Sequence, residues 1–295
     1  MGNGQNDNDQ GRKLTMKTAI VTDSTAYIPQ HIRESHDIHM IPLSVNFGDE
    51  TYQEEVEITS QQFFEKMRNQ QELPTTSQPS IGMFVELFER LSKEYDAVIS
   101  IHLSSGISGT YNGAATAGDM VENIEVYPFD TEVSAMVQGF YALEAAEMAQ
   151  AGKSPADIMA RLEEMKKTMS AYIMVDDLTN LQKGGRLSGA AALIGSLLQV
   201  KPILHFENRV IVPYEKVRTK KKALNRVFDL LHEDAKDNEP MRVVVIHANR
   251  PEEAEKMKEE LQEKYKNIEC MVSYFGPVVG THLGEGAIGI GWYKR

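Results

Sequence analysis

The 295-residue chain is 41% hydrophobic and 25% charged, as soluble globular proteins are, and it is long enough for two domains with separate cores. A formal net charge of −12 argues against nucleic acid or an anionic membrane as the main partner, since both need a broad basic surface. The single cysteine, Cys270, excludes an intramolecular disulfide and a cysteine-based zinc site, and it is typical of a reducing compartment.

The first fifteen residues predict a disordered leader. They are rich in Asn, Gln, Gly and Asp and lack the apolar core of a signal peptide, so we expect the ordered chain to begin at Met16. No stretch approaches the roughly 20 apolar residues of a membrane span. We therefore expect a cytoplasmic protein without a transmembrane segment, and the sequence leaves only transient membrane contact open.

Residues 16–168 predict an N-terminal α/β domain. Apolar runs at 18–22, 97–102 and 124–129 predict strands, and the segments between them carry helical spacing or helix caps. Because strands alternate with helices, the sheet is expected to be parallel, with its ligand-binding loops gathered at the carboxyl ends of the strands.

Two segments of this domain have less regular patterns. The run Met40–Phe47 alternates Leu, Val and Phe with other residues, and it predicts one strand. The stretch Leu73–Ser80 is polar and bounded by prolines, so we expect no regular structure there. Its hydroxyl groups nevertheless make it a candidate ligand-binding loop.

A hydroxyl-rich loop at 103–110 follows the predicted strand 97–102. Gly106 and Gly109 allow a tight turn, while three serines and a threonine supply hydrogen-bond donors at the carboxyl end of the strand. The following helix adds free N–H groups and its dipole, which favour an anionic head group. The alternative is that these hydroxyls only cap the helix. A second such loop, Asp23-Ser24-Thr25, ends the first strand.

Residues 169–295 predict a C-terminal α+β domain with a mixed or antiparallel sheet. The apolar runs 203–206 and 210–212 flank Glu207-Asn208 and predict an antiparallel hairpin. An almost uncharged helix is expected at 190–199, and such a helix is either buried or lines an apolar cavity.

The glycine-rich segment 278–291 carries His282, and we expect this segment to return to the ligand site. Its run Gly284–Gly289 matches the dinucleotide pattern G-x-G-x-x-G. That motif opens a helix inside a β-α-β unit, and only six residues follow it here, so we reject a dinucleotide site. The glycines near His282 instead allow another backbone or a ligand to approach its ring closely.

Two chemistries remain open for Ser108 and His282. With Asp176 or Asp177 they follow the chain order of an α/β-hydrolase triad, although the loop departs from the nucleophile motif G-x-S-x-G. Alternatively, the three hydroxyl loops and His282 form a neutral, donor-rich set without an obvious charged base, which suits the binding of a carboxylate.

Five motifs together resemble the DegV family of bacterial fatty-acid-binding proteins. They are Val21–Thr25, Thr76–Pro79, Leu103–Tyr111, Gly184–Arg186 and Thr281–Gly289, and their order and spacing extend from about Met16 to the C-terminus. The resemblance implies a two-domain α/β fold with one long-chain fatty acid in a tunnel between the domains. It also implies that some members are binding subunits of fatty acid kinase, which present the carboxylate to a separate ATP-using subunit that forms acyl phosphate.

The resemblance further implies roles for individual residues. Thr76, Ser108 and His282 would bind the carboxylate, with the Gly109 N–H as a fourth contact. The remaining implied positions are Asp23, Ser24 and Ser105 as supporting residues and Arg218 for kinase docking or phosphoryl transfer. No residue is expected to be catalytic, and neither a metal nor a cofactor is implied beyond the bound fatty acid. An acyl hydrolase with Ser108 as nucleophile and a stand-alone lipid buffer without a kinase are the alternatives.

Overall fold

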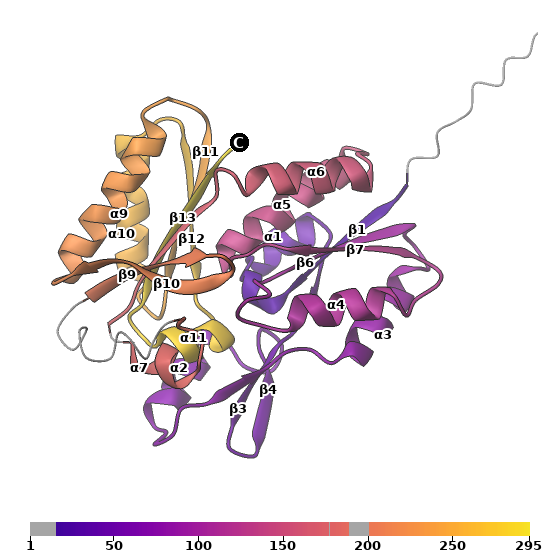
Figure 1. The fold of residues 1–295 in the computed structure, drawn as a ribbon, viewed down its shortest axis with the longest axis horizontal. Helices are drawn as coiled ribbons and strands as arrows, with labels where there is room; N and C mark the ends of the chain where they lie inside the picture. The colour runs from indigo at the N-terminus through magenta and orange to yellow at the C-terminus, as the bar shows by residue number, and fades with distance from the viewer. Residues whose placement is uncertain (1–15, 177, 189–200) are drawn as a thin grey trace, which may run out of the picture.

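The computed structural model describes residues 16–176, 178–188 and 201–295, which form a two-domain α/β fold with three sheets (Figure 1). Within these ranges no helix is both long enough and apolar enough to cross a membrane. The predicted leader at 1–15, Asp177 and the predicted helix at 190–199 lie outside the described residues.

The N-terminal domain is built on a four-stranded sheet in which every pair of neighbours is parallel, as predicted. Its strands, in the order β2-β1-β6-β7, are β1 (Thr18–Asp23), β2 (Ile38–Ile41), β6 (Ala97–His102) and β7 (Glu125–Asp130). Successive side chains of a strand face opposite sides, so Ala19 and Val21 pack under α3 and α4 while Ile20 faces α5. The helices of this domain are η1 (Ser24–Ala26), α1 (Gln30–Ser35), α2 (Ser60–Arg68), α3 (Ile81–Leu91), α4 (Thr110–Gly118), α5 (Met136–Gln150) and α6 (Pro155–Met165).

A small antiparallel sheet in the order β4-β3-β5 corrects two predictions. Its strands are β3 (Ser44–Phe47), β4 (Glu50–Gln53) and β5 (Thr75–Ser77). The single strand predicted at 40–47 is wrong, because Pro42 and Leu43 divide it between two sheets, and a proline lacks the N–H that a continuous ladder needs. Irregular structure at 73–80 is also wrong in part, since β5 pairs with β3 and sets Thr76 opposite Val45.

The C-terminal domain contains a six-stranded mixed sheet in the order β10-β9-β8-β13-β11-β12. Its strands are β8 (Ser170–Met174), β9 (Lys201–Glu207), β10 (Val210–Val217), β11 (Met241–His247), β12 (Ile268–Tyr274) and β13 (Ile288–Lys294), and its helices are α7 (Thr179–Lys183), α9 (Lys220–Ala235), α10 (Pro251–Lys264) and α11 (Pro277–Leu283). The predicted hairpin is confirmed as β9 and β10, which are joined by Asn208 and Arg209 with positive φ angles. Helices α9 and α10 cover one face of this sheet.

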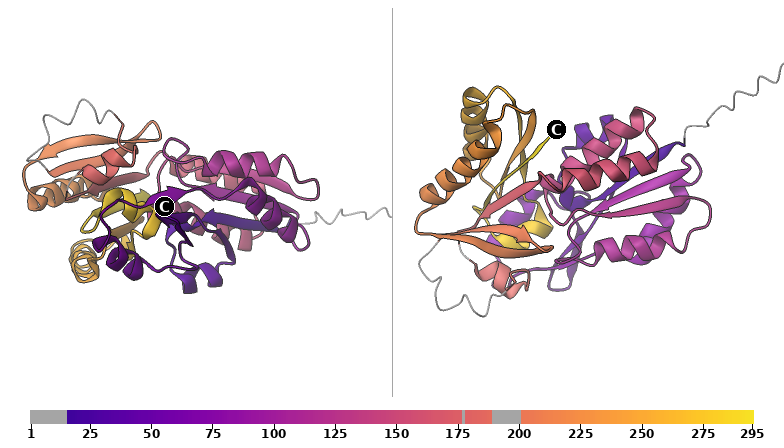
Figure 2. Two further views of the ribbon diagram at one scale, coloured as in Figure 1. Left: turned by 90° about the horizontal axis from the view of Figure 1, so that it is seen from below. Right: turned by 45° about the horizontal axis from the view of Figure 1, so that its top comes forward.

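The other face of the C-terminal sheet packs on the N-terminal domain. Helix α5 is buried between the two large sheets, and its Phe140 ring lies 5.3 Å from the ring of Tyr293 on β13. Gly291 on β13 allows this approach, because a Cβ there would overlap the side chain of Val137. Both views in Figure 2 show the yellow helix α11 beside the N-terminal half of the chain, and α11 contacts α2, β3 and β5.

Candidate functional site

A cavity of about 310 Å³ lies where the two domains meet, at the lower end of the size range of small-molecule sites. Both domains contribute to its wall. The aliphatic lining residues are Leu43, Leu103, Ile107, Ile173, Ile211, Val278, Val279 and Leu283. The polar lining residues are Thr76, Ser77, Gln78, Ser108, Ser134, Arg186 and His282, with Gly109 beside them. The cavity therefore combines an apolar wall with a set of hydrogen-bonding groups.

His282 on α11 and Thr76 on β5 meet in this wall, 206 positions apart in the chain. The Nε2 atom of His282 lies 3.0 Å from Oγ1 of Thr76. Burial, with a smaller contribution from the Arg186 guanidinium, lowers the pKa of His282 to about 4, so the imidazole is neutral at pH 7. Its Nδ1 atom is buried and has no hydrogen-bond partner in the described part of the chain. Gly184 packs directly on this atom, where a Cβ would overlap it.

Ser108 and Gly109 line the same cavity from the loop before α4. Oγ of Ser108 lies 2.8 Å from Oγ1 of Thr110 and accepts a hydrogen bond from the Thr110 N–H at 3.3 Å. Gly109 packs against the side-chain amide of Gln78, which leaves no room for a Cβ. The structure thus places all four residues that the family resemblance assigned to the carboxylate, Thr76, Ser108, Gly109 and His282, around one cavity.

The C-terminal domain holds this loop from the other side. Oγ of Ser104 donates to the backbone carbonyl of Arg209, at the tip of the β9–β10 hairpin, over 2.6 Å. Gly106 packs on the same carbonyl, and a Cβ there would overlap it. The Arg209 guanidinium lies 3.3 Å from a carboxylate oxygen of Asp130 on β7. Contacts from both domains therefore fix the loop that carries Ser108.

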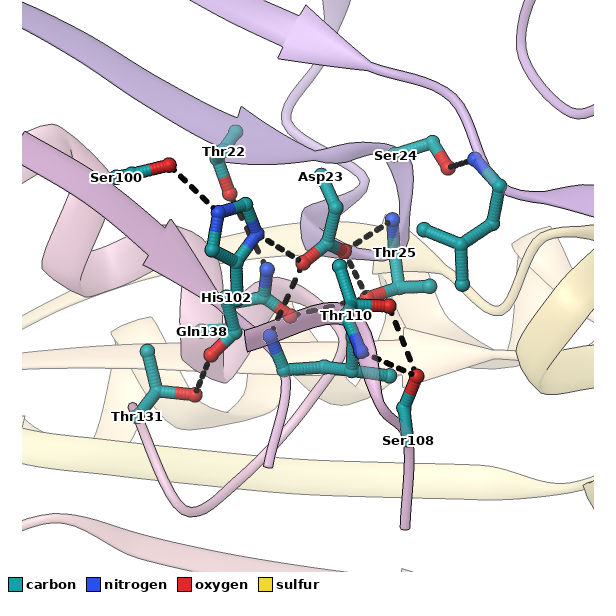
Figure 3. Close-up of polar contacts among 12 residues, drawn as sticks. Thr22, Asp23, Ser24, Thr25, Ser100, His102, Ser108, Thr110, Thr131 and Gln138 are labelled. Atoms are coloured by element: carbon teal, nitrogen blue, oxygen red, sulfur yellow. Dashed lines mark hydrogen bonds and ion pairs between the residues drawn. The ribbon is translucent and has the colours of Figure 1, made fainter. Parts of the chain in front are cut away.

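Asp23 lies outside the cavity lining, in a buried network beneath the loop (Figure 3). Its carboxylate accepts hydrogen bonds from the N–H of Leu103 and the hydroxyl of Thr25, and it lies 3.0 Å from Nδ1 of His102. Burial alone would raise the pKa of Asp23, but the hydrogen bonds and the nearby imidazole outweigh burial and hold the pKa below its ordinary value. Asp23 thus anchors the start of the loop.

His102 also lies 2.7 Å from Oγ of Ser100, so Ser100, His102 and Asp23 reproduce the order of contacts in a Ser-His-Asp triad. All three side chains are completely buried, and none lines a cavity described here. A substrate has no access to them. We assign this arrangement to positioning of the loop rather than to catalysis.

Ser24 and Ser105, the other two supporting residues, also lie away from the cavity lining. Oγ of Ser24 donates to the buried carboxyl of Glu54 over 2.6 Å. Oγ of Ser105 donates to Asp130 over 2.5 Å. Both hydroxyls are therefore engaged by carboxyl groups of the protein itself, and any effect on a ligand would pass through the loops that they hold.

The hydrolase arrangement of Ser108, His282 and Asp176 is not assembled. Ser108 is paired with Thr110 and His282 with Thr76, whereas Asp176 lies near the amine of Lys201. A catalytic histidine needs an acid that orients its second nitrogen, and Nδ1 of His282 has none among the described residues. Asp177, the other candidate acid, lies outside the described residues. The geometry therefore favours binding over nucleophilic attack.

Arg186 is a site residue to which the sequence analysis gave no role. Its half-buried guanidinium donates to the backbone carbonyls of Gly184 at 2.6 Å and Ile107 at 3.3 Å, and so joins the two domains. Burial lowers its pKa from the ordinary value, but an arginine at this depth keeps its charge. Among the described lining residues it is the one with a permanent positive charge. The signal available in the sequence was its place in the motif Gly184–Arg186.

Arg218 lies outside this arrangement, in the short connection between β10 and α9. Its side chain is exposed, and within the described ranges no ion pair or hydrogen bond involves its guanidinium. It is absent from the cavity lining. The described residues also contain no group of three or more His, Cys, Asp or Glu side chains that could hold a metal ion.

Comparison with known proteins identifies the family. The protein-family model described as "Uncharacterised protein, DegV family" matches residues 17–295 of the chain. The chain is 64% identical over 278 residues to Protein DegV of Bacillus subtilis, an alignment that covers 94% of this chain and 99% of the relative. The chain belongs to the DegV family. The motifs that the sequence analysis singled out contribute Thr76, Ser108, Arg186 and His282 to the lining of the cavity.

Solved DegV structures share the whole fold. A crystal structure of DegV, described as a fatty acid binding protein from Bacillus subtilis, is 63% identical, has a TM-score of 0.91 and covers 95% of this chain and 100% of its own. A Thermus thermophilus DegV family protein described by its fatty acid binding is 29% identical, with a TM-score of 0.89 and coverage of 95% and 100%. The two-domain α/β fold is therefore that of the DegV family.

Proposed function

We propose that this DegV family protein binds one long-chain fatty acid in the cavity between its domains and presents the carboxylate to a partner kinase, which forms acyl phosphate. The observation that carries this proposal is that Thr76, Ser108, His282 and Arg186 line one cavity together with eight aliphatic residues. Relatives described as fatty acid binding proteins support the ligand class. In this proposal the protein acts in the cytoplasm as a carrier and is not itself an enzyme.

The acyl chain supplies most of the binding free energy. Burial of about fifteen methylene groups at roughly 0.8 kcal/mol each offers on the order of 12 kcal/mol, before association and ordering costs of several kcal/mol. The head group therefore needs to add little affinity. Its surroundings must instead avoid the cost of a buried charge without a partner, which is several kcal/mol.

The polar residues of the wall meet that requirement in two ways. The hydroxyls of Thr76 and Ser108 and the N–H of Gly109 donate hydrogen bonds, and the Arg186 guanidinium compensates the negative charge. His282, which is neutral in the free protein, orients the hydroxyl of Thr76 through their 3.0 Å contact. These groups then hold the carboxylate in one orientation. In this proposal none of them acts as a base that activates a nucleophile.

Replacing Ser108 or Thr76 by alanine is expected to reduce phosphorylation of the bound fatty acid more than retention of the acyl chain. Each variant removes one hydrogen bond to a charged group, which corresponds to a loss of roughly tenfold or more in the step that needs the oriented carboxylate. Acyl retention rests on the aliphatic wall and should change less than that. Bound lipid is measured by extraction and mass spectrometry, and phosphorylation with the purified kinase. A variant that lost its lipid but kept full phosphorylation per bound lipid would contradict these assignments.

Arg218→Ala is expected to separate the kinase-linked carrier from a stand-alone lipid buffer. Arg218 is exposed and unpaired within the described residues, so its replacement should leave the fold intact. The affinity of the variant for fatty acid should stay within twofold of the wild-type affinity. Capture of the kinase and the rate of phosphorylation should fall about tenfold or more. Lys153→Ala, another exposed residue without an ion pair among the described residues, is the control. Unchanged kinase capture by Arg218→Ala would argue against this docking role.

A further inference from the structure

A second cavity of about 340 Å³ adjoins the first at the proposed carboxylate site. Thr76, Arg186 and His282 line both cavities, so these three residues form the boundary between them. The other residues that line the second cavity are Leu73, Pro74, Thr75, Asn180, Lys183, Gly184 and Thr281. A ligand head group held at the boundary therefore has space on the side opposite to the aliphatic wall.

The chemistry of the second cavity differs from that of the first. Most of the described residues that line it are polar, two of them are cations, and none is acidic. Lys183 is exposed at the end of α7 and forms no ion pair with a carboxylate in the described part of the chain. His282 is neutral and contributes no charge to this lining. The two cations therefore favour an anion over an acyl chain in this cavity.

The second cavity also continues toward the surface. A third hollow, of about 380 Å³, shares Leu73, Asn180 and Lys183 with it and extends to Met67 and Gln70 at the end of α2. The second cavity and this hollow therefore adjoin on the side away from the aliphatic wall, and the hollow carries one acidic lining residue, Glu72. Lys183 lines both parts of this route.

We propose that the second cavity is the subsite for the phosphoryl group of the acyl phosphate, with Lys183 as its cationic contact beside Arg186. The inference rests on the proposed function. In the transfer, a carboxylate oxygen forms a bond to the γ-phosphorus of a nucleoside triphosphate held by the kinase, and the bond from that phosphorus to the β–γ bridging oxygen breaks. The nucleoside diphosphate leaves with that electron pair. The carboxylate carries no proton, so this chain needs no general base.

The test compares two ligands with the same acyl chain on the delipidated protein. One is hexadecanoic acid, and the other is the β-ketophosphonate in which a methylene group replaces the bridging oxygen of hexadecanoyl phosphate. Lys183→Gln is expected to weaken binding of the phosphonate about five- to tenfold, because the substitution removes one of the two cations that contact the doubly charged phosphonate. Its affinity for hexadecanoic acid should stay within twofold of the wild type. Lys153→Gln, which changes the net charge equally, should alter neither affinity.

The possible outcomes distinguish a failure of the phosphoryl subsite from a failure of the proposed function. If Lys183→Gln leaves phosphonate affinity unchanged, or weakens both ligands equally, the phosphoryl subsite is overturned while fatty-acid binding stands. If the wild-type protein binds hexadecanoic acid poorly, the proposed function fails, and the subsite fails with it. A selective loss of phosphonate affinity in Lys183→Gln alone supports the inference.

Discussion

Replacing Glu54 by alanine is expected to lower the free energy of unfolding by about 3 kcal/mol at pH 6. Glu54 is completely buried and accepts hydrogen bonds from the hydroxyls of Ser24 and Tyr27 and from the N–H of Val278. Each buried donor left without an acceptor costs about 1–3 kcal/mol. Because Val278 lies in the first turn of α11, the substitution should also loosen the helix that carries His282. Guanidinium chloride unfolding measures the loss of stability.

Glu54→Gln is the matched variant, and it isolates the charge of Glu54. Burial raises the pKa of Glu54 to about 8, so the folded protein keeps a proton that the unfolded chain, with a pKa near 4.5, has released. The stability due to this proton is complete below pH 4.5 and is lost as the pH rises through 8. Between pH 5 and pH 8 the wild type should therefore lose about 3 kcal/mol relative to Glu54→Gln. Parallel pH profiles of the two proteins would contradict a protonated Glu54.

Gly184→Ala is expected to reduce phosphorylation of the bound fatty acid about tenfold or more, and to change the affinity for the fatty acid less than that. A Cβ at this position would overlap Nδ1 of His282 and lie 3.0 Å from the backbone carbonyl of Asn180, so the imidazole must turn away from Thr76. Loss of the oriented hydroxyl at a charged head group corresponds to about 1.5–3 kcal/mol. The rate of phosphorylation per bound hexadecanoic acid, measured with the purified kinase, checks this expectation.

Two controls identify the cause of the Gly184→Ala effect. Gly82→Ala adds the same methyl group where the nearest heavy atom is 3.9 Å away, and it should leave the rate of phosphorylation unchanged. In a His282→Ala background, Gly184→Ala should have little further effect, since the side chain that it displaces is gone. Additive losses in the double variant would show that Gly184 acts by a route other than His282. A fully active Gly184→Ala protein would contradict the role assigned to His282.

The central parallel sheet could be predicted because its strands are local in sequence. Each of β1, β6 and β7 is a short apolar run that ends in polar residues, and these runs alternate with helical segments. The starts of helices are also encoded locally, because the residues of a capping box lie close to one another in the sequence. Examples are Thr59 with Gln62 at α2 and Ser154 with Asp157 at α6. Family motifs then indicated the four residues that the structure places around the cavity.

The elements that escaped prediction depend on tertiary context. Strand β5 has only three residues and is stabilised by its pairing with β3. Such a short segment shows no alternating pattern from which a strand could be predicted. Strand β13 contains two glycines, which disfavour strands in isolation but allow close packing at the centre of a buried sheet. Arg186 and Glu54 became interpretable only when the fold showed which distant backbone groups they contact.

The central claim is tested most directly by native mass spectrometry of the protein purified from bacterial cells, followed by lipid extraction. The account predicts one long-chain fatty acid per chain, and it predicts that the delipidated protein takes up one equivalent of hexadecanoic acid. A protein that emerges without an acyl ligand and takes none up would contradict it.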